Sequence, residues 1–345
     1  MGYYPCATNH MTSRFNNLLD AFATRRVAVV GDFLLDQYVL GTTARVSREA
    51  PIVVIDYQET VNHPGGAANA AQNVTALRGA ALAVGVVGSD REGDALVTLL
   101  RERGVDTTSL FALPRAATSL KLRIMAGEMN AQKQQVARVD RSYRVELDGA
   151  ARETLAAAVE SAAAGCDAML LADYGLGVLP DDVARRAIDA CRARGVPVVV
   201  DSRYRALAFR GATVATPNEV EAMAALGLES ESDLMDSARL SRALAGAGIE
   251  NLIVKRGSKG MIVCNAGGDI ASIGIAGSRQ ATDVTGAGDT VAAVVALSLA
   301  AGATLEEAAR MATFAASVVV MKRGTATASP DEVRALIGTG DAVWS

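Results

Sequence analysis

Short apolar runs alternate along this chain with longer segments in which Ala, Arg and Glu recur at helical spacing. The runs predict buried strands at residues 26–31, 82–88, 167–172, 196–201, 213–216 and 251–255. The segments between them predict helices at residues 67–77, 92–103, 150–163, 181–194, 218–226 and 233–245. Strands that are apolar throughout and separated by helices indicate a mostly parallel central sheet, covered by helices on both faces.

Two segments, at about residues 38–57 and 119–140, interrupt this alternation. They contain short β-like stretches at 53–56, 120–124 and 134–139, with no helix between them. We interpret them as a small antiparallel sheet that projects from the main domain. Because an exposed apolar face or an open edge invites association, such a sheet would close over a ligand, pair with a second subunit, or do both.

Composition narrows the class of protein. The 345 residues are 50% hydrophobic with a net charge of -4, which fits one large α/β domain or two smaller ones. The lack of a basic run and the 4% aromatic content argue against nucleic acid as a partner. The four scattered cysteines are better explained as thiols in a reducing compartment than as disulfides or zinc ligands. The presence of only two histidines argues against most His-based metal sites and Ser-His-Asp triads.

The ends of the chain carry no targeting signal in this interpretation. Residues 1–12 lack the basic and apolar regions of a signal peptide, and the apolar run 291–299 is too short to span a membrane. We therefore expect a cytoplasmic protein with no membrane partner, a flexible tail over residues 1–14 and a single domain over 15–345.

The most informative stretch is Ala281–Thr290, which places a glycine turn before a long apolar helix (290–301). Gly286 and Gly288 let the backbone approach a ligand closely, and the positive end of the helix attracts phosphate. Asp289 beside a phosphate would be suited to take a proton from an attacking hydroxyl. Taken alone, the stretch is more often a plain tight turn between a strand and a helix than a phosphate site.

Three further motifs each have a plain structural explanation beside the functional one. Gly65, Gly66 and Asn69 open a helix and either form a simple turn or contact a ligand. Asn218 and Glu221 match a capping box, and they could also hold a hydrated Mg²⁺ through waters. The stretch 255–260, with Lys255, Gly257 and Gly260, is either a hairpin turn or a wall of a nucleotide pocket.

The order of these motifs, ending in Asp-x-Thr-Gly-Ala-Gly-Asp, resembles the ribokinase-like (PfkB) family of carbohydrate kinases from about residue 26 to residue 334. Within that family the chain is most similar to kinases of D-glycero-D-manno-heptose 7-phosphate. The supporting stretches are residues 31–38, 45–51, 121–123, 134–140, 172–175 and 324–330. The resemblance implies a three-layer α/β sandwich with a small antiparallel β-lid, which commonly builds a homodimer.

The resemblance also implies a role for each matching residue. Asp289 would be the general base, and the amides of Gly286, Ala287 and Gly288 would stabilise the transferring phosphoryl group. The sugar would be held by Asp32, Gly65, Gly66 and Asn69, with Asp36 as a further candidate. ATP and Mg²⁺ would be organised by Asn218 and Glu221, with Lys255, Gly257 and Gly260 in the wall of the nucleotide pocket. A monovalent cation such as K⁺ would lie near Asp283, Thr285 and Gly324.

Positive charge in or near the predicted lid suits a substrate that already carries a phosphate. The residues concerned are Lys121, Arg123, Arg138 and Arg48, and ordinary solvated charge explains any one of them equally well. Two positions depart from the heptose kinases: Leu176 stands where Lys is usual, and Asp201-Ser-Arg203 replaces Asp-Pro-Lys. Because the chain ends at Ser345, we expect no nucleotidyltransferase half in it.

The sequence therefore predicts an ATP-dependent kinase that phosphorylates heptose 7-phosphate at C1 to give the 1,7-bisphosphate. One alternative is a kinase of the same family for ribose, fructose, a hexose phosphate or a nucleoside. A Rossmann dehydrogenase is disfavoured, because Gly31 is not followed by the Gly-x-x-Gly continuation of that fingerprint. A catalytically silent protein on the kinase fold is disfavoured by the intact Asp289, Asn218 and Glu221.

Overall fold

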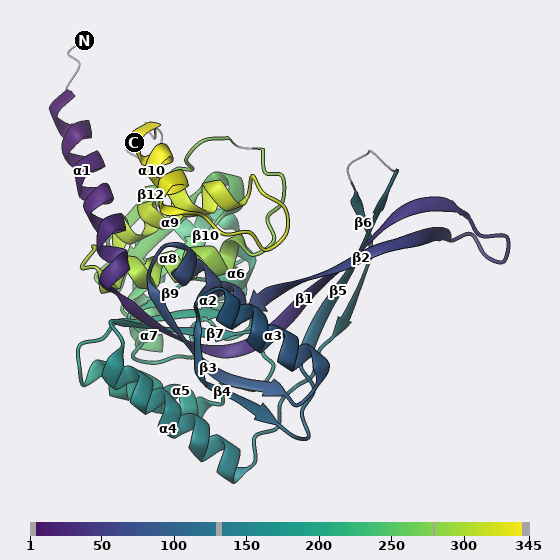
Figure 1. Cartoon of the computed structure of the whole chain (residues 1–345). Helices are drawn as coiled ribbons and strands as arrows, with labels where there is room; N and C mark the ends of the chain where they lie inside the picture. Colours follow the sequence, from purple (N-terminus) through teal and green to yellow (C-terminus); the bar gives the residue numbers. More distant parts are fainter. Residues whose placement is uncertain (1–4, 129–132, 279, 340–345) are drawn as a thin grey trace.

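The computed structural model describes residues 5–128, 133–278 and 280–339, and its centre is a mostly parallel sheet (Figure 1). The strand order is β12-β11-β10-β9-β8-β7-β1-β3-β4. All neighbours from β10 to β4 are parallel, and β11 is antiparallel to both of its neighbours, β10 and β12. The strands are β1 (Arg26–Val46), β3 (Ala80–Gly88), β4 (Asp106–Leu113), β7 (Ala168–Asp173), β8 (Val198–Ser202), β9 (Val214–Ala215), β10 (Asn251–Lys255), β11 (Met261–Asn265) and β12 (Ile270–Ile273). This sheet confirms the predicted fold class.

Helices cover both faces of the sheet, and alternate strand residues show which helices lie on which face. Val27 and Val29 belong to the apolar cluster of one face, whereas Ala28 and Val30 belong to the cluster of the other. The first face carries α1 (Pro5–Ala21), α2 (Ala67–Ala76), α3 (Arg91–Glu102), α8 (Ala287–Ala300), α9 (Leu305–Val319) and α10 (Pro330–Thr339). The second face carries α4 (Gly149–Gly165) and α5 (Asp181–Arg192), with α6 (Glu219–Leu226) and α7 (Ser237–Ala247) beside β10 and β11.

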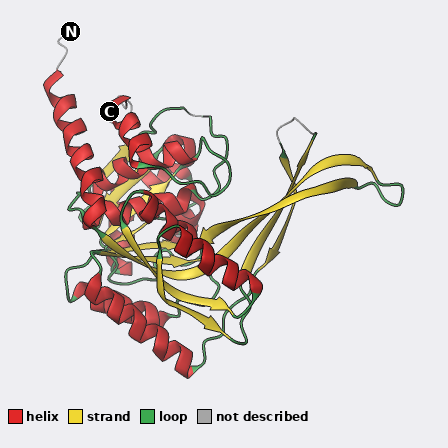
Figure 2. Cartoon of the chain, in the orientation of Figure 1, coloured by secondary structure: helices red, strands yellow, loops and turns green. Residues whose placement is uncertain are grey.

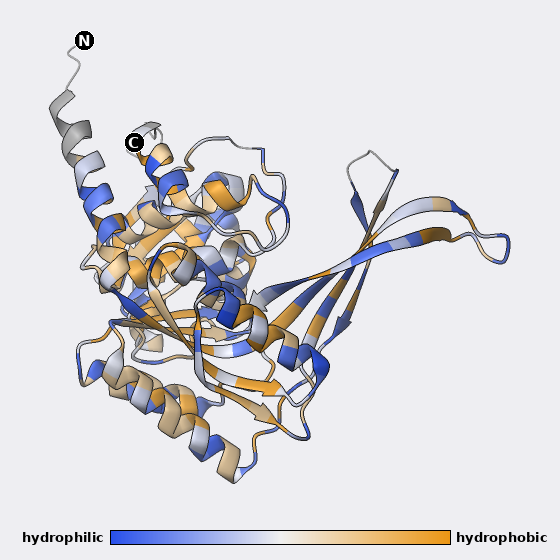
Figure 3. Ribbon diagram, in the orientation of Figure 1, coloured by the Kyte–Doolittle hydropathy of each residue, from blue (hydrophilic) through white to orange (hydrophobic). Residues whose placement is uncertain are grey.

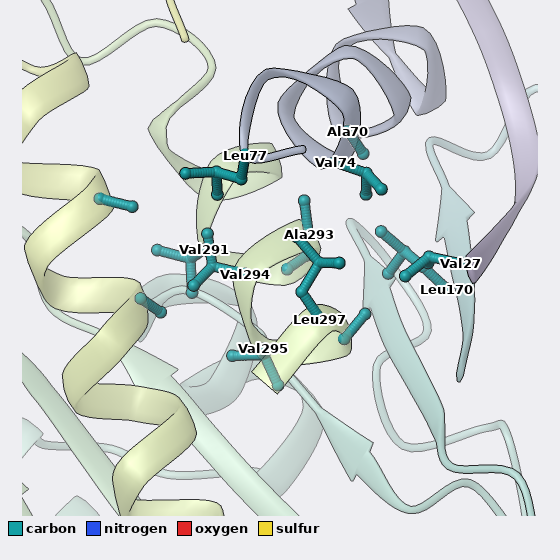
Figure 4. Packing of buried hydrophobic residues seen from close by; sticks show 14 of the residues in the cluster. Val27, Ala70, Val74, Leu77, Leu170, Val291, Ala293, Val294, Val295 and Leu297 are labelled. Atoms are coloured by element: carbon teal, nitrogen blue, oxygen red, sulfur yellow. The ribbon is translucent and has the colours of Figure 1, made fainter. Parts of the chain in front are cut away.

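Helix α8 lies at the centre of the first face. Every residue from Asp289 to Ser298 is buried, as expected for a helix that is apolar all round. Figure 4 shows Val291, Val294 and Leu297 of this helix packed among side chains of α2 and the central strands. The N-terminus of α8 is therefore held rigidly against the sheet, which matters for the site described below.

A second sheet extends from the body as a continuation of β1 (Figures 1 and 2). Beyond Asp32, β1 leaves the central sheet and pairs antiparallel with β2 (Val53–Gly66) and parallel with β5 (Ser119–Gly127). Strand β6 (Gln134–Arg141) then pairs antiparallel with β5. We call residues 33–46, 53–66, 119–127 and 134–141 the projecting sheet. Its two outer pairings are antiparallel, as predicted, while the central β1–β5 pairing is parallel.

The projecting sheet is far more exposed than the body. Every residue of β6 is exposed, as are Val46 and Tyr57 in β1 and β2. Figure 3 shows apolar and polar residues interspersed along these strands.

Several features differ from the predicted elements, and helices α9 and α10 and strand β12 lie where no element was predicted. Helix α1 begins at Pro5, within the predicted tail, and its Arg14 forms a 2.8 Å ion pair with Glu307; residues 1–4 of that tail lie outside the described residues. Helix α7 starts at Ser237, not at residue 233, because Asp236 caps it and a 3-10 turn over Glu231–Met235 precedes it. Strand β4 was not predicted. Among the described helices, none combines the length and apolar content needed to cross a membrane.

Candidate active site

A cavity of about 560 Å³ opens where the carboxyl ends of β7, β8 and β10 meet the N-terminus of α8. Most predicted nucleotide and catalytic residues line it, together with apolar side chains from α8 and α9. The lining includes Asp201, Arg203, Asn218, Glu221, Lys255, Gly257, Gly260, Val284, Gly286, Ala287, Gly288, Asp289, Val291, Ala316 and Val320. The cavity lies at the carboxyl edge of the parallel strands, where ligands bind in open α/β sheets.

The turn before α8 requires glycine. Gly286 has a φ of 78°, and a Cβ on it would lie 2.5 Å from Nδ2 of Asn69. A Cβ on Gly288 would lie 3.3 Å from Nζ of Lys255, so the ammonium group sits beside the first turn of the helix. Helix start and ammonium together make this end of the cavity suitable for an anion.

The three amides predicted to bind the phosphoryl group are not equivalent. The N–H of Ala287 donates to the carbonyl of Val284 at 3.2 Å. No protein acceptor within the described residues takes the N–H of Gly286 or Gly288. Two of the three predicted donors therefore remain available to a ligand.

Asp289 is buried at the edge of this cavity, with 7% of its surface exposed. Oδ2 accepts from Nδ2 of Asn69 at 2.7 Å, and Oδ1 accepts a short hydrogen bond from the hydroxyl of Tyr174. Burial raises the pKa of Asp289 to about 6, while the hydrogen bonds from Tyr174 and Asn69 oppose that rise. The carboxylate is therefore ionised at neutral pH, with a basicity suited to a general base.

Asn69, predicted to hold sugar hydroxyls, is instead committed within the protein. Its Nδ2 donates to Asp289 and, at 3.3 Å, to the carbonyl of Gly286. Its Oδ1 accepts from Gln72 at 2.6 Å and from Asn73 at 3.2 Å. These contacts make Asn69 a residue that positions Asp289, and they leave little capacity for a ligand.

Asp32, also predicted to contact the sugar, is likewise satisfied by the protein. Its carboxylate accepts the backbone N–H groups of Tyr174 at 2.7 Å, Leu176 at 3.0 Å and Val178 at 3.2 Å. It lines a separate, very small cavity together with Leu176, not the main one. Burial raises the pKa of Asp32 to about 6. Asp32 thus holds the loop after β7, and its contact with the sugar stays a prediction.

Asp36 is the better-placed carboxylate of the two. It is 3% exposed, forms a 2.6 Å ion pair with Arg123, and lies against Gly65, whose Cβ would come within 2.9 Å of Oδ2. Gly65 and Gly66 pair with Leu34 and Phe33 across the root of the projecting sheet. The structure thus brings Asp36 and the glycine pair together, and their contact with the sugar stays a prediction.

The predicted basic residues of the projecting sheet have different surroundings. Nζ of Lys121 lies 5.0 Å from the ring centroid of Tyr174, and burial lowers the pKa of its ammonium group. Arg123 is buried and paired with Asp36, whereas Arg138 is more exposed and pairs with Asp140 at 2.6 Å. Of the three, Lys121 makes no ion pair within the described residues, which leaves its charge available to an anion.

Asn218 and Glu221 form the capping box of α6. Oδ1 of Asn218 accepts the N–H of Glu221 at 2.9 Å, and Oε2 of Glu221 accepts the N–H of Asn218 at 2.8 Å. Burial raises the pKa of Glu221. The plain explanation of this motif is thus confirmed. Both residues also line the cavity, so their interaction with hydrated Mg²⁺ stays a prediction.

The turn after β10 forms one wall of the cavity, as predicted. Gly257 and Gly260 both have positive φ, and a Cβ on Gly260 would lie 2.0 Å from the carbonyl oxygen of Ile273. Lys255 is anchored by a 2.6 Å ion pair with Asp201, which also accepts from Thr216 at 3.0 Å. Asp201 and Tyr174 are site residues to which the sequence interpretation assigned no role. Their signals were their place at or just after strand ends and their position in two stretches noted for the family resemblance, 172–175 and 201–203.

The residues predicted to surround a monovalent cation do come together. Asp283 accepts the N–H of Thr285 and the N–H of Gly324, each at 2.9 Å, which joins two loops far apart in the sequence. Elsewhere in the described ranges, no group of three or more His, Cys, Asp or Glu residues is arranged to hold a metal. The binding of a cation by these loops stays a prediction.

Comparison with known proteins agrees with this geometry. Residues 24–332 match the pfkB family of carbohydrate kinases, and the chain belongs to that family. It is also similar to the bifunctional protein HldE of Trichlorobacter lovleyi, with 36% identity over 326 residues. That match covers 93% of this chain and 64% of HldE, so the chain spans less than two thirds of the length of this curated relative.

Solved structures share the fold. Arabidopsis thaliana ribokinase complexed with ribose and ATP has a TM-score of 0.67 at 22% identity. Phosphofructokinase-2 from Escherichia coli in complex with potassium has a TM-score of 0.71 at 20% identity. Each match covers 91% of this chain and 98% of the other. At these identities the likeness concerns the ribokinase-like fold alone.

Proposed function

We propose that this carbohydrate kinase transfers the γ-phosphoryl group of ATP to D-glycero-D-manno-heptose 7-phosphate at C1, giving the 1,7-bisphosphate. One observation carries the proposal. Asp289, the available amides of Gly286 and Gly288, and the ammonium of Lys255 meet at one end of a single cavity. A buried base beside an anion cradle is the arrangement that phosphoryl transfer to an alcohol requires.

In this mechanism Asp289 accepts the proton of the attacking hydroxyl as the phosphoryl group moves. Asn69 fixes Oδ2 of the carboxylate, and the amides of Gly286 and Gly288 donate to the developing negative charge. Asn218 and Glu221 line the same cavity, and Glu221 has one carboxylate oxygen outside the capping box, so both fit a water-mediated Mg²⁺ site. When bound there, Mg²⁺ would neutralise phosphate charge.

The identity of the sugar rests on charge and on similarity. Lys121 makes no ion pair within the described residues and would bind the phosphate of the substrate, with the partly exposed Arg138 as a further contact. Arg123 is paired with Asp36 and would contribute less charge. The similarity to HldE over 93% of the chain favours a heptose phosphate. Leu176, which replaces the usual Lys, lines the small cavity beside Asp32, so its change does not remove charge from the main cavity.

Three further properties belong to the same proposal. The Asp283 and Gly324 loops would bind K⁺, in line with the potassium complex of phosphofructokinase-2. The projecting sheets of two copies would pair in a homodimer, because exposed Val46, Ile52 and Val139 otherwise face water. A protein that draws on ATP and sugar phosphates would work in the cytoplasm.

Product analysis tests the substrate directly. Incubation with Mg-ATP and heptose 7-phosphate should yield a new anomeric phosphate signal by phosphorus NMR, with one ADP released per product. A parallel panel of ribose, fructose and hexose phosphates serves as the control. If one of those sugars is phosphorylated and the heptose phosphate is not, the kinase activity stands and the proposed substrate is wrong.

A further inference from the structure

Tyr174 contacts three separate parts of the molecule. Its hydroxyl donates to Oδ1 of Asp289, and its backbone N–H donates to Oδ2 of Asp32 at 2.7 Å. Its ring lies below the ammonium of Lys121, with 5.0 Å between Nζ and the ring centroid. Lys121 belongs to β5 of the projecting sheet, where it is level with Asp36 of β1. One side chain therefore joins the projecting sheet to the carboxylate in the body.

We propose that Tyr174 is a positioning residue that fixes the carboxylate of Asp289 for proton transfer and ties its orientation to the projecting sheet through Lys121. This inference rests on the proposed role of Asp289 as the base. Tyr174 itself does not take or give the transferred proton.

The two donors that hold Asp289 differ in what holds them. Asn69 is locked in helix α2 by Gln72 and Asn73, which are both almost completely buried. Tyr174 is held through its backbone N–H, which donates to Asp32, and through its ring, over which the ammonium group of Lys121 lies. Hence Oδ2 of Asp289 is fixed by Asn69 of helix α2. Oδ1 of Asp289 is fixed by Tyr174, which contacts Lys121 of the projecting sheet.

The charges around Asp289 show what this hydrogen bond changes. Lys255 and Lys121 favour the ionised carboxylate, Asp201 disfavours it, and the donors Tyr174 and Asn69 favour it. The pKa of Tyr174 is raised well above its usual value, chiefly by burial, so its hydroxyl remains a donor at neutral pH. Removing that hydroxyl should make Asp289 harder to ionise, because a hydrogen bond to the charged form favours that form.

The test is Tyr174→Phe, with kcat/KM measured from pH 5 to pH 8.5. The ring and its contact with Lys121 are kept, so the variant should fold, which thermal unfolding checks. We expect the acid limb of this profile, where kcat/KM falls as Asp289 becomes protonated, to move to higher pH by about one unit. Below pH 6, kcat/KM should then be lower by roughly tenfold, and the loss should narrow at higher pH. Tyr204→Phe, an exposed tyrosine beside Gly175, is the matched control and should leave the limb in place.

A second variant, Lys121→Met, tests the link to the projecting sheet. If Lys121 acts through the ring of Tyr174, this change should shift the acid limb in the native chain and have a much smaller effect in the Tyr174→Phe background. If Lys121→Met shifts the acid limb equally in the native chain and in the Tyr174→Phe variant, Lys121 acts on Asp289 only through the electric field of its charge. That result would overturn the proposed link through Tyr174.

The outcomes separate this inference from the proposed function. If Asp289→Asn abolishes turnover but Tyr174→Phe leaves the limb unmoved, Tyr174 does not position the base and the kinase proposal stands. If Asp289→Asn retains full turnover, Asp289 is not the base and both proposals fail.

Discussion

The body and the projecting sheet share strand β1, which is buried in the body and becomes exposed in the projecting sheet. From Val27 to Asp36, β1 is buried; from Gln37 onward its residues become half-buried and, near Val46, exposed. The body strands pack helices on both faces, whereas every residue of β6 in the projecting sheet is exposed. Asp289 and the glycine turn belong to the body, whereas the basic residues that would select the substrate belong to the projecting sheet.

Because of this difference, we expect substitutions in the body and in the projecting sheet to affect different properties of the protein. Burial in the body fixes Asp289 and shifts its pKa, so changes there should affect catalysis and stability. The projecting sheet has little buried apolar surface of its own, so changes there should affect substrate binding or association.

The largest expected effect is that of Asp289→Asn in the body. Loss of the base should lower kcat by roughly 10²–10⁴-fold, measured by ADP release at saturating substrates. Stability should not fall, since the folded pKa is about 6 against a usual 3.8. A raised folded pKa means that the stabilising contribution of this carboxyl group is complete below pH 3.8 and is lost as the pH rises through about 6.

At pH 7.5 the neutral Asn should therefore leave the free energy of unfolding equal or higher, and urea titration at pH 7.5 and pH 4 measures this. A variant that is much less stable at pH 7.5 would contradict the cause given for the raised pKa of Asp289.

A matched pair of valines sharpens the comparison in stability. Val199→Ala in β8 removes a fully buried side chain and should lower the free energy of unfolding by about 2 kcal/mol. Val139→Ala in β6 changes a side chain that is 55% exposed and should stay within roughly 0.5 kcal/mol. Urea titration of both variants at two protein concentrations checks this. A cost at Val139 that is larger at the higher protein concentration would indicate that a second copy covers the projecting sheet, as in the proposed homodimer.

The smallest expected effect is that of Arg138→Met in the projecting sheet. Loss of a partly exposed charge should raise KM for the sugar phosphate by about 3- to 10-fold and leave kcat unchanged, because the residue does not contact Asp289. Steady-state kinetics with sugar phosphate and with the corresponding free sugar check this. An equal rise in KM for both sugars would show that Arg138 does not recognise the phosphate.

The sequence predicted the layers, and it predicted the glycine turn that lines the cavity, because both depend on local patterns. Apolar runs define the parallel strands, and the glycine turn before α8 is visible in Gly286 and Gly288. The partners of Asp289 could not be predicted, since Asn69 and Tyr174 lie 220 and 115 residues away along the chain.

Asp32 and Asp36 illustrate the same limit. Four residues apart on one strand, they look interchangeable in the sequence. What distinguishes them is the change of partner at Phe33, where β1 exchanges β3 for β2 and β5. That change depends on tertiary pairing, which no local pattern in residues 26–46 encodes. Helix α1 was also missed, because its first residues carry no clear apolar period.

Strand β1 crosses from one sheet to the other without a break, and this has a consequence for how the gene could vary. A strand presents successive side chains to opposite sides, so inserting or deleting a single codon between Asp32 and Asp36 would turn the whole outer arm over. The basic side chains of the projecting sheet would then lie on its opposite face. These few residues therefore act as a spacer of fixed length.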